Sequence, residues 1–214
     1  MSEILQTHYA KFYADGGWRY DRARERTFLQ ERIIEPLGLK TSMKIIDLGC
    51  GMGLFTSLFH ELGFDIVGAD MSETGIAHAR QTYPGVRYVR ADAEEVLRDT
   101  PPATYDVIFV RGMSWYHYEL TSVNKLGVDV PARTRDLFTL LKPGGLFVLQ
   151  IKTDFTGRRP ASGVYHCKVE EFRALFAPLG EIVLLTDWEG TPLETNEDGE
   201  KSGKKVIIAT RKPL

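Results

Sequence analysis

The sequence contains few cysteines and no long apolar run, and each absence excludes a class of protein. Its two cysteines, Cys50 and Cys167, are too few for a disulfide framework or a cluster of thiolate metal ligands. No window reaches the roughly 18 apolar residues of a membrane-spanning helix, and the opening residues MSEILQTHYAKFY hold no apolar signal core. We therefore expect a cytoplasmic protein that does not cross a membrane.

The chain also lacks an excess of charge of either sign. Its formal net charge is −2, so no overall positive field favours a nucleic-acid partner. The densest basic stretch, residues 19–26, is interleaved with Asp21 and Glu25, as on a solvated helix face. No group of Asp, Glu and His residues has the spacing of metal ligands, so no metal is expected.

Seven short apolar stretches are the main feature that is present. The first five are continuous rather than alternating, which is typical of strands buried on both faces of a sheet. Helix-compatible segments separate most of them, and such alternation predicts an α/β fold with right-handed crossovers. The stretches are residues 43–49, 65–70, 86–92, 105–112, 146–152, 181–188 and 204–210.

The last connection differs from the others. Residues 189–203 are polar, rich in turn residues and without a helical stripe. Because parallel neighbours need a crossover, the final two strands are predicted to pair antiparallel through a long hairpin. At 214 residues, the chain is expected to form one domain, residues 1–214, with a core over residues 41–214.

Residues 1–40 are predicted to form N-terminal helices. Leu29, Ile33 and Leu37 have helical spacing, and Pro36 marks the end of that helix. The preceding residues are aromatic and contain a Gly-Gly break, so they form either a lid over a site or a packed segment. The aromatic candidates for substrate contact there are Tyr13, Trp18 and Tyr20.

A glycine-rich loop follows the first predicted strand, in IIDLGCGMGLFT at residues 45–56. Its spacing is G-x-G-x-G, and Leu54 follows its last glycine, whereas dinucleotide-binding proteins have G-x-G-x-x-G. Asp70 ends the second stretch, where a carboxylate can accept two ribose hydroxyls. Asp92 ends the third, where it can accept from an adenine amine. These residues favour a nucleoside ligand.

In combination, four motifs resemble those of the class I S-adenosylmethionine-dependent methyltransferases. They are DLGCGMG (47–53), GADMS (68–72), RADAEEV (90–96) and LKPGG (141–145), and the resemblance covers residues 40–152. It implies a Rossmann-like seven-stranded, mostly parallel sheet with helices on both faces and one antiparallel strand near the C-terminus. The implied strand order is 3-2-1-4-5-7-6, and the implied cofactor is S-adenosylmethionine, with S-adenosylhomocysteine as product.

The resemblance also implies roles for individual residues. Asp47 and the backbone of the first glycines would lie by the methionine end, Asp70 by the ribose, and Met71 on the adenine face. Asp92 and the Ala93 amide would contact the adenine edge, and Arg111 would offer its backbone carbonyl. Cys50 is a small filler of the loop rather than a nucleophile. The implied cofactor-binding residues are Asp47, Gly49, Cys50, Gly51, Gly53, Asp70, Met71, Asp92, Ala93, Glu94 and Arg111.

The methyl acceptor is expected beside the segment after the fourth strand, RGMSWYHYELTSVN. His117 is the candidate general base because its unperturbed pKa is about 6.5, with Tyr116 beside it; the alternative is a histidine with a structural hydrogen bond. Trp115 is either a substrate wall or a packing residue. A second candidate group, for an anionic acceptor or an ordinary solvated loop, is Arg158, Arg159, Tyr165 and His166.

These patterns predict a methyltransferase acting on a small molecule, with O-, N- or C-methylation left open. The segment lacks the Asn/Asp-Pro-Pro-aromatic motif of the family's amide N-methyltransferases and a cysteine nucleophile for pyrimidine methylation. One alternative is a non-catalytic cofactor-binding sensor or partner subunit, and another is a protein or RNA methyltransferase. A nicotinamide enzyme is disfavoured by the glycine spacing. The chain is expected to be a monomer or homodimer.

Overall fold

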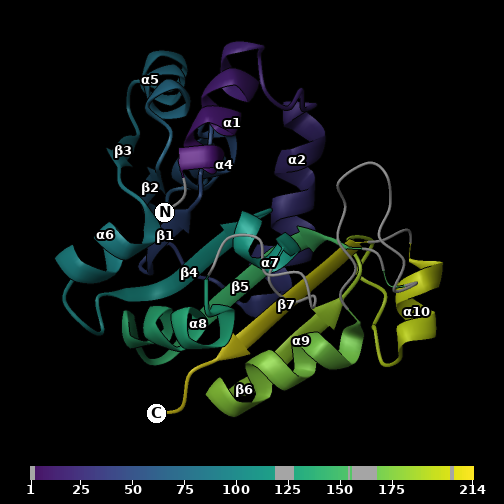
Figure 1. The fold of residues 1–214 in the computed structure, drawn as a ribbon. Helices are drawn as coiled ribbons and strands as arrows, with labels where there is room; N and C mark the ends of the chain where they lie inside the picture. Colours follow the sequence, from purple (N-terminus) through teal and green to yellow (C-terminus); the bar gives the residue numbers. More distant parts are fainter. Residues whose placement is uncertain (1–2, 119–127, 154, 156–167, 203–204) are drawn as a thin grey trace. The chain divides into compact units, whose positions relative to one another are not determined.

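The computed structural model describes residues 3–118, 128–153, 155, 168–202 and 205–214 (Figure 1). The chain divides into two compact units, Met1–Phe109 and Val110–Leu214. Within the described residues, no helix is long and apolar enough to cross a membrane. The same residues contain no group of three or more His, Cys, Asp or Glu side chains placed to hold a metal ion.

All seven predicted strands are present, and they form one sheet in the order β3-β2-β1-β4-β5-β7-β6, which confirms the expected fold. β1 pairs parallel with β2, and β2 with β3, whereas β7 pairs antiparallel with both β5 and β6. The predicted hairpin of the last two strands is therefore confirmed. The strands are β1 Lys44–Leu48, β2 Asp65–Asp70, β3 Arg87–Arg90, β4 Tyr105–Arg111, β5 Leu141–Lys152, β6 Glu181–Thr186 and β7 Lys205–Arg211.

The helices of the first unit begin and end at residues that local chemistry favours. Asp21 accepts the backbone N–H groups of Ala23 and Arg24 at the start of α2. The Ser72 hydroxyl oxygen accepts the backbone N–H of Gly75 at the start of α5. Gly38, with φ 60°, ends α3 one residue after Leu37. The helices are α1 Glu3–Ala14, α2 Arg22–Leu29, η1 Gln30–Ile34 (a π-helical turn), α3 Glu35–Leu37, α4 Leu54–Glu61, α5 Glu73–Thr82 and α6 Ala93–Asp99.

The second unit departs from the predicted pattern after β6. Before that point, α8 ends at Thr139 and β5 begins at Leu141. The connection between β6 and β7 contains a short helix, α10, that the missing apolar stripe did not predict. Thr195 and Asp198 form a capping box that starts it. The helices are α7 Ser114–Tyr118, α8 Val130–Thr139, α9 Val169–Phe176, η2 Ala177–Leu179 and α10 Asn196–Lys201.

Candidate functional site

The glycine loop of the first unit turns the chain from β1 into α4 with backbone angles that suit glycine. Gly49, Gly51 and Gly53 have φ of 81°, 55° and 82°, in the left-handed region that side chains disfavour. The N–H groups of Gly49 and Cys50 donate to the carbonyl oxygen of Ala69 at 2.8 and 3.0 Å. These bonds fix the loop against the end of β2, where Asp70 follows.

Asp70 is the best-placed polar group of this site. Its side chain is 8% exposed. One carboxylate oxygen accepts the N–H of Gly51 at 2.8 Å and the other accepts the N–H of Ser72 at 2.8 Å. Because each carboxylate oxygen has two acceptor sites, each can take one further donor, such as a ribose hydroxyl. Burial raises the pKa of Asp70, while the two backbone hydrogen bonds lower it.

The side chains of Asp47 and Cys50 hold the glycine loop in place through a hydrogen bond and through packing, respectively. Asp47 is 1% exposed, and one of its carboxylate oxygens accepts the hydroxyl of Thr56 at 2.6 Å, which ties β1 to α4. Cys50 packs against the cluster of Ile76, Ala79 and Tyr88. Burial raises the pKa of the Cys50 thiol, as do the charges of Asp47 and Asp70. A thiol in this state is a packing group rather than a nucleophile.

Asp92 was predicted to end the third strand, but β3 ends two residues earlier, at Arg90, and Asp92 starts α6 instead. One carboxylate oxygen accepts the N–H groups of Glu94 and Glu95, both at 2.9 Å, at the start of α6. A Glu95 carboxylate oxygen accepts the backbone N–H of Asp92, which completes a capping box. Ala93 is buried and Met71 is half-buried. The capping role therefore accounts for Asp92 without a ligand.

Tyr13 is the N-terminal aromatic that lies against the glycine loop. A Cβ atom added at Gly51 would lie 2.7 Å from the Tyr13 hydroxyl oxygen, and one added at Gly75 would lie 3.2 Å from its ring. Burial raises the pKa of Tyr13, and the charge of Asp70 adds to the effect, so its hydroxyl stays protonated. Trp18 and Tyr20 instead pack against Phe12 and Phe55.

The aromatic residues of α7 lie in the core of the second unit. Tyr116 is fully buried beside Phe147 and Phe176, and its hydroxyl lies 3.1 Å from the Thr134 hydroxyl. Trp115 is 2% exposed. These positions fit packing residues and give no support to a catalytic Tyr116 or a substrate wall at Trp115. The side chain of His117 and residues Arg158, Arg159, Tyr165 and His166 lie outside the described part of the chain.

A Tyr116→Phe substitution separates packing from catalysis. Removing the buried hydroxyl should lower the free energy of unfolding by about 1 kcal/mol, because the Thr134 hydroxyl loses a partner but keeps its bond to the Val130 carbonyl. The rate of methyl transfer per folded molecule should not change. Urea unfolding and a transfer assay on one preparation measure both quantities. A loss of turnover of tenfold or more at unchanged stability would contradict the core assignment.

A group of cations around Trp188 was not predicted from the sequence. The guanidinium of Arg111 and the ammonium groups of Lys152 and Lys205 lie 5.6, 5.8 and 5.4 Å from the centre of the Trp188 ring. Arg111 was expected to act through its backbone carbonyl, and its side chain provides this further contact. In the sequence, Arg111 and Lys152 lie at or near the ends of two predicted strands, and Lys205 lies near the start of a third. These positions indicate a cluster only when the pairing of the strands is known.

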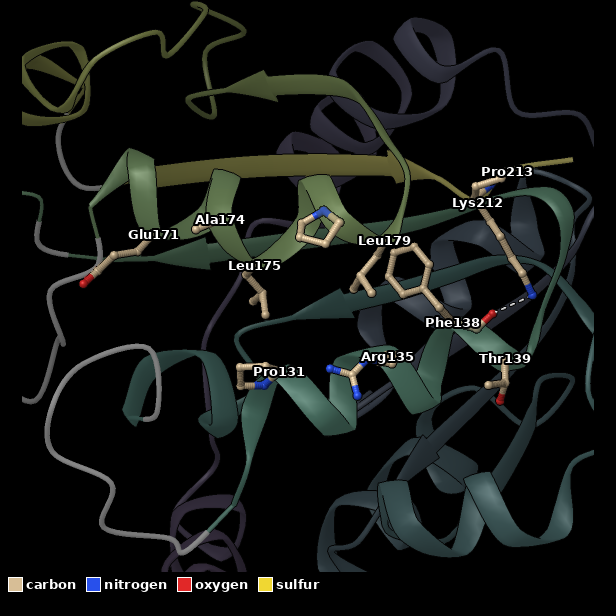
Figure 2. A pocket seen from close by; sticks show the side chains of 11 residues that line it. Pro131, Arg135, Phe138, Thr139, Glu171, Ala174, Leu175, Leu179, Lys212 and Pro213 are labelled. Carbon is tan, nitrogen blue, oxygen red and sulfur yellow. Dashed lines mark hydrogen bonds between the residues drawn. The ribbon is translucent and has the colours of Figure 1, made fainter.

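A groove of about 630 Å³ lies elsewhere in the second unit, between α8 and α9 (Figure 2). Pro131, Phe138, Leu175 and Leu179 supply much of its apolar wall. The ammonium of Lys212 at its edge donates to the carbonyls of Phe138 and Leu141 at 2.9 and 2.7 Å. The residues predicted to bind cofactor or substrate are not part of this lining.

Residues 45–145, which include the glycine loop, match a family model described as a methyltransferase domain. Among curated proteins, a ubiquinone biosynthesis O-methyltransferase of Rhodopseudomonas palustris is 28% identical over 123 residues, which are 56% of this chain and 44% of that protein. A trans-aconitate 2-methyltransferase of Delftia acidovorans is 28% identical over 132 residues, 60% of this chain and 45% of that protein. The chain spans less than half the length of these curated relatives.

A solved structure supports the same relationship. An S-adenosylmethionine-dependent methyltransferase from Mesorhizobium loti superposes with a TM-score of 0.61 at 25% identity. The alignment covers 86% of this chain and all (100%) of that protein. The similarity in structure therefore extends beyond residues 45–145, which the family model matches.

Proposed function

We propose that this chain, which has the fold and the glycine-loop domain of the class I S-adenosylmethionine-dependent methyltransferases, methylates a small molecule. The observation that carries the proposal is the position of Asp70. Its carboxylate is fixed at the end of β2 by the N–H groups of Gly51 and Ser72 and keeps acceptor capacity for two more donors. S-Adenosylmethionine, when bound, supplies a sulfonium methyl group with its own leaving group.

The residues of the first unit have separate tasks in this proposal. Asp70 accepts the ribose hydroxyls, and Gly49 and Gly51, which have no side chain, let the loop backbone approach the ligand. Met71 covers the adenine and the Ala93 amide contacts its edge. Asp47 holds the loop in shape through Thr56. His117 stays the candidate base for an acceptor that must lose a proton.

Tyr13 is proposed to close the cofactor site from α1. Its neutral hydroxyl lies by Gly51, where it can donate to the ligand and exclude water. Tyr13→Ala should weaken S-adenosylhomocysteine binding about tenfold, and Tyr13→Phe by less, because the ring remains. Titration calorimetry measures both, with Trp18→Ala as the control from the same segment, since Trp18 is 65% exposed. Tighter binding by Tyr13→Ala would show that Tyr13 occupies the place of the ligand.

The proposed activity is tested by pairing a binding measurement with a transfer measurement. Calorimetry with S-adenosylmethionine, S-adenosylhomocysteine and NADH should give micromolar binding of the first two only. Transfer of a labelled methyl group to a broad panel of small acceptors should then give product. Binding without transfer to any acceptor would favour the non-catalytic sensor or partner subunit instead. Transfer only to protein or RNA would favour the macromolecular alternative. A cytoplasmic location and a monomeric or homodimeric state stay predictions.

A further inference from the structure

The cations around Trp188 form a group that neither the glycine loop nor the family motifs explain. Arg111 is the last residue of β4, Lys152 the last of β5 and Lys205 the first of β7, which pairs opposite Lys152. Trp188 follows the end of β6, and its indole N–H donates to the Val206 carbonyl at 3.3 Å, which fixes the ring. Three strands thus bring three positive charges to one aromatic ring.

Lys205 is the member of this group whose carboxylate partner among the described residues is known. Glu189 accepts from the Lys205 ammonium at 3.0 Å, and its side chain is 59% exposed. The neighbouring Asp187 is 5% exposed, and one of its carboxylate oxygens accepts the N–H groups of Glu189 and Thr191 in its own turn. Like charges held close together repel, so a bound anion would stabilise this arrangement.

A buried amide provides a second, independent indication of a ligand. Gln150 is fully buried, yet neither its side-chain oxygen nor its nitrogen has a hydrogen-bond partner among the residues that the structure describes. Its side chain projects from the same face of β5 as that of Lys152, two residues further on. Its backbone carbonyl accepts the N–H of Gly112, directly after Arg111. Buried polar groups are rarely left without a partner, so this amide is suited to bind a polar ligand.

We propose that Arg111, Lys152, Lys205 and Gln150 bind the oxyanion of a small acidic ligand. That ligand is the methyl acceptor, an assignment that rests on the proposed function. The guanidinium and the two ammonium groups supply charged donors, and the Gln150 amide supplies a neutral one. Trp188 holds the cations in place through its ring. A carboxylate and a phosphate share the required chemistry, and the test distinguishes them.

The test uses the indole N–H signal of Trp188 in the full chain, observed by NMR and assigned with Trp188→Phe. Citrate and inorganic phosphate are titrated separately at constant ionic strength maintained with sodium chloride. The signal should shift saturably with at least one of them, and the tighter of the two identifies the preferred oxyanion. Lys152→Met should weaken this binding about tenfold, because a charged donor is lost. Lys201→Met is the control: it removes the same charge from an exposed helix residue that pairs with Glu197.

Glu189→Gln should change the oxyanion affinity in the opposite direction to Lys152→Met, which a purely structural role of the cations would not do. Removing the carboxylate that pairs with Lys205 should tighten oxyanion binding, by about two- to threefold. The inference is overturned if neither anion gives a saturable shift, or if Lys152→Met and Lys201→Met bind alike. S-Adenosylhomocysteine binding is measured on the same samples. Its absence would defeat the proposed function, whereas its presence without oxyanion binding would defeat only this inference.

Discussion

An Asp70→Asn variant is expected to lose most of its affinity for S-adenosylmethionine and S-adenosylhomocysteine. The substitution replaces one acceptor oxygen by an NH₂ group, which cannot accept the N–H of Gly51 or Ser72 or a ribose hydroxyl. Hydrogen bonds to a charged group contribute about 1.5–3 kcal/mol each. Losing one ribose contact outright and the charge on the other should therefore cost about 2.5–4 kcal/mol, which is roughly a 10²- to 10³-fold weaker Kd.

Calorimetric titration of wild type and variant measures this effect directly. Asp65→Asn is a matched control, because it makes the same substitution at the other end of β2, where the Asp65 side chain is 54% exposed and pairs with Arg87. Thermal unfolding of the free proteins checks that both variants are folded. If Asp70→Asn binds S-adenosylhomocysteine within threefold of wild type, the ribose contact is wrong and the proposed cofactor site with it.

The titration of Asp70 should make both the stability of the fold and the binding of the ligand depend on pH, which gives a second test of the Asp70→Asn variant. Burial raises the pKa of Asp70 above its ordinary value of 3.8. The ligand-free fold therefore loses stability as pH rises from that value through the raised pKa, because the unfolded chain releases the proton first. Ligand binding should show the reverse, since only the charged form accepts both hydroxyls, and it should weaken as pH falls through the same range. Asp70→Asn should remove both dependences.

The fold could be predicted from the sequence because its strands are buried on both faces. Runs such as residues 105–112 and 146–152 are continuous and apolar, and such runs are typical of strands buried on both faces of a sheet. They could therefore be predicted as strands from their own residues alone. The polar connection after residue 188 likewise required an antiparallel pair, which β6 and β7 form. The same pattern predicted that the acids after these strands lie at one edge of the sheet, because the carboxyl ends of parallel strands meet there.

The parts that sequence did not predict depend on contacts between distant residues or on very short local signals. The cations on Trp188 come from β4, β5 and β7, and no spacing along the chain relates Arg111 to Lys205. α10 is only 6 residues long, so a capping box rather than an apolar stripe defines it. Tyr116 was considered for catalysis because it adjoins His117, yet helical geometry directs it into the core.

Gly53→Ala is expected to destabilise the first unit more than any other single-methyl change in the loop. Gly53 has φ +82°, and a Cβ atom there would lie 2.6 Å from the Tyr88 hydroxyl and 2.7 Å from the Ala79 Cβ. Tyr88 cannot easily withdraw, because it is 5% exposed and donates to the Gly53 carbonyl at 3.0 Å. Left-handed strain of about 1–2 kcal/mol and overpacking of about 1–3 kcal/mol should add to roughly 2–5 kcal/mol.

Urea unfolding of Gly53→Ala against Gly38→Ala separates these two contributions. Gly38 has φ +60° and nothing within 4 Å of an added Cβ, so its substitution meets the backbone strain alone. The excess loss at Gly53 is then the cost of the contact, and adding Tyr88→Phe should recover part of it by removing the closest atom. Equal losses at the two glycines would mean that β3 and α5 can move apart. The loop would then be held by its backbone conformation rather than by the packing beneath it.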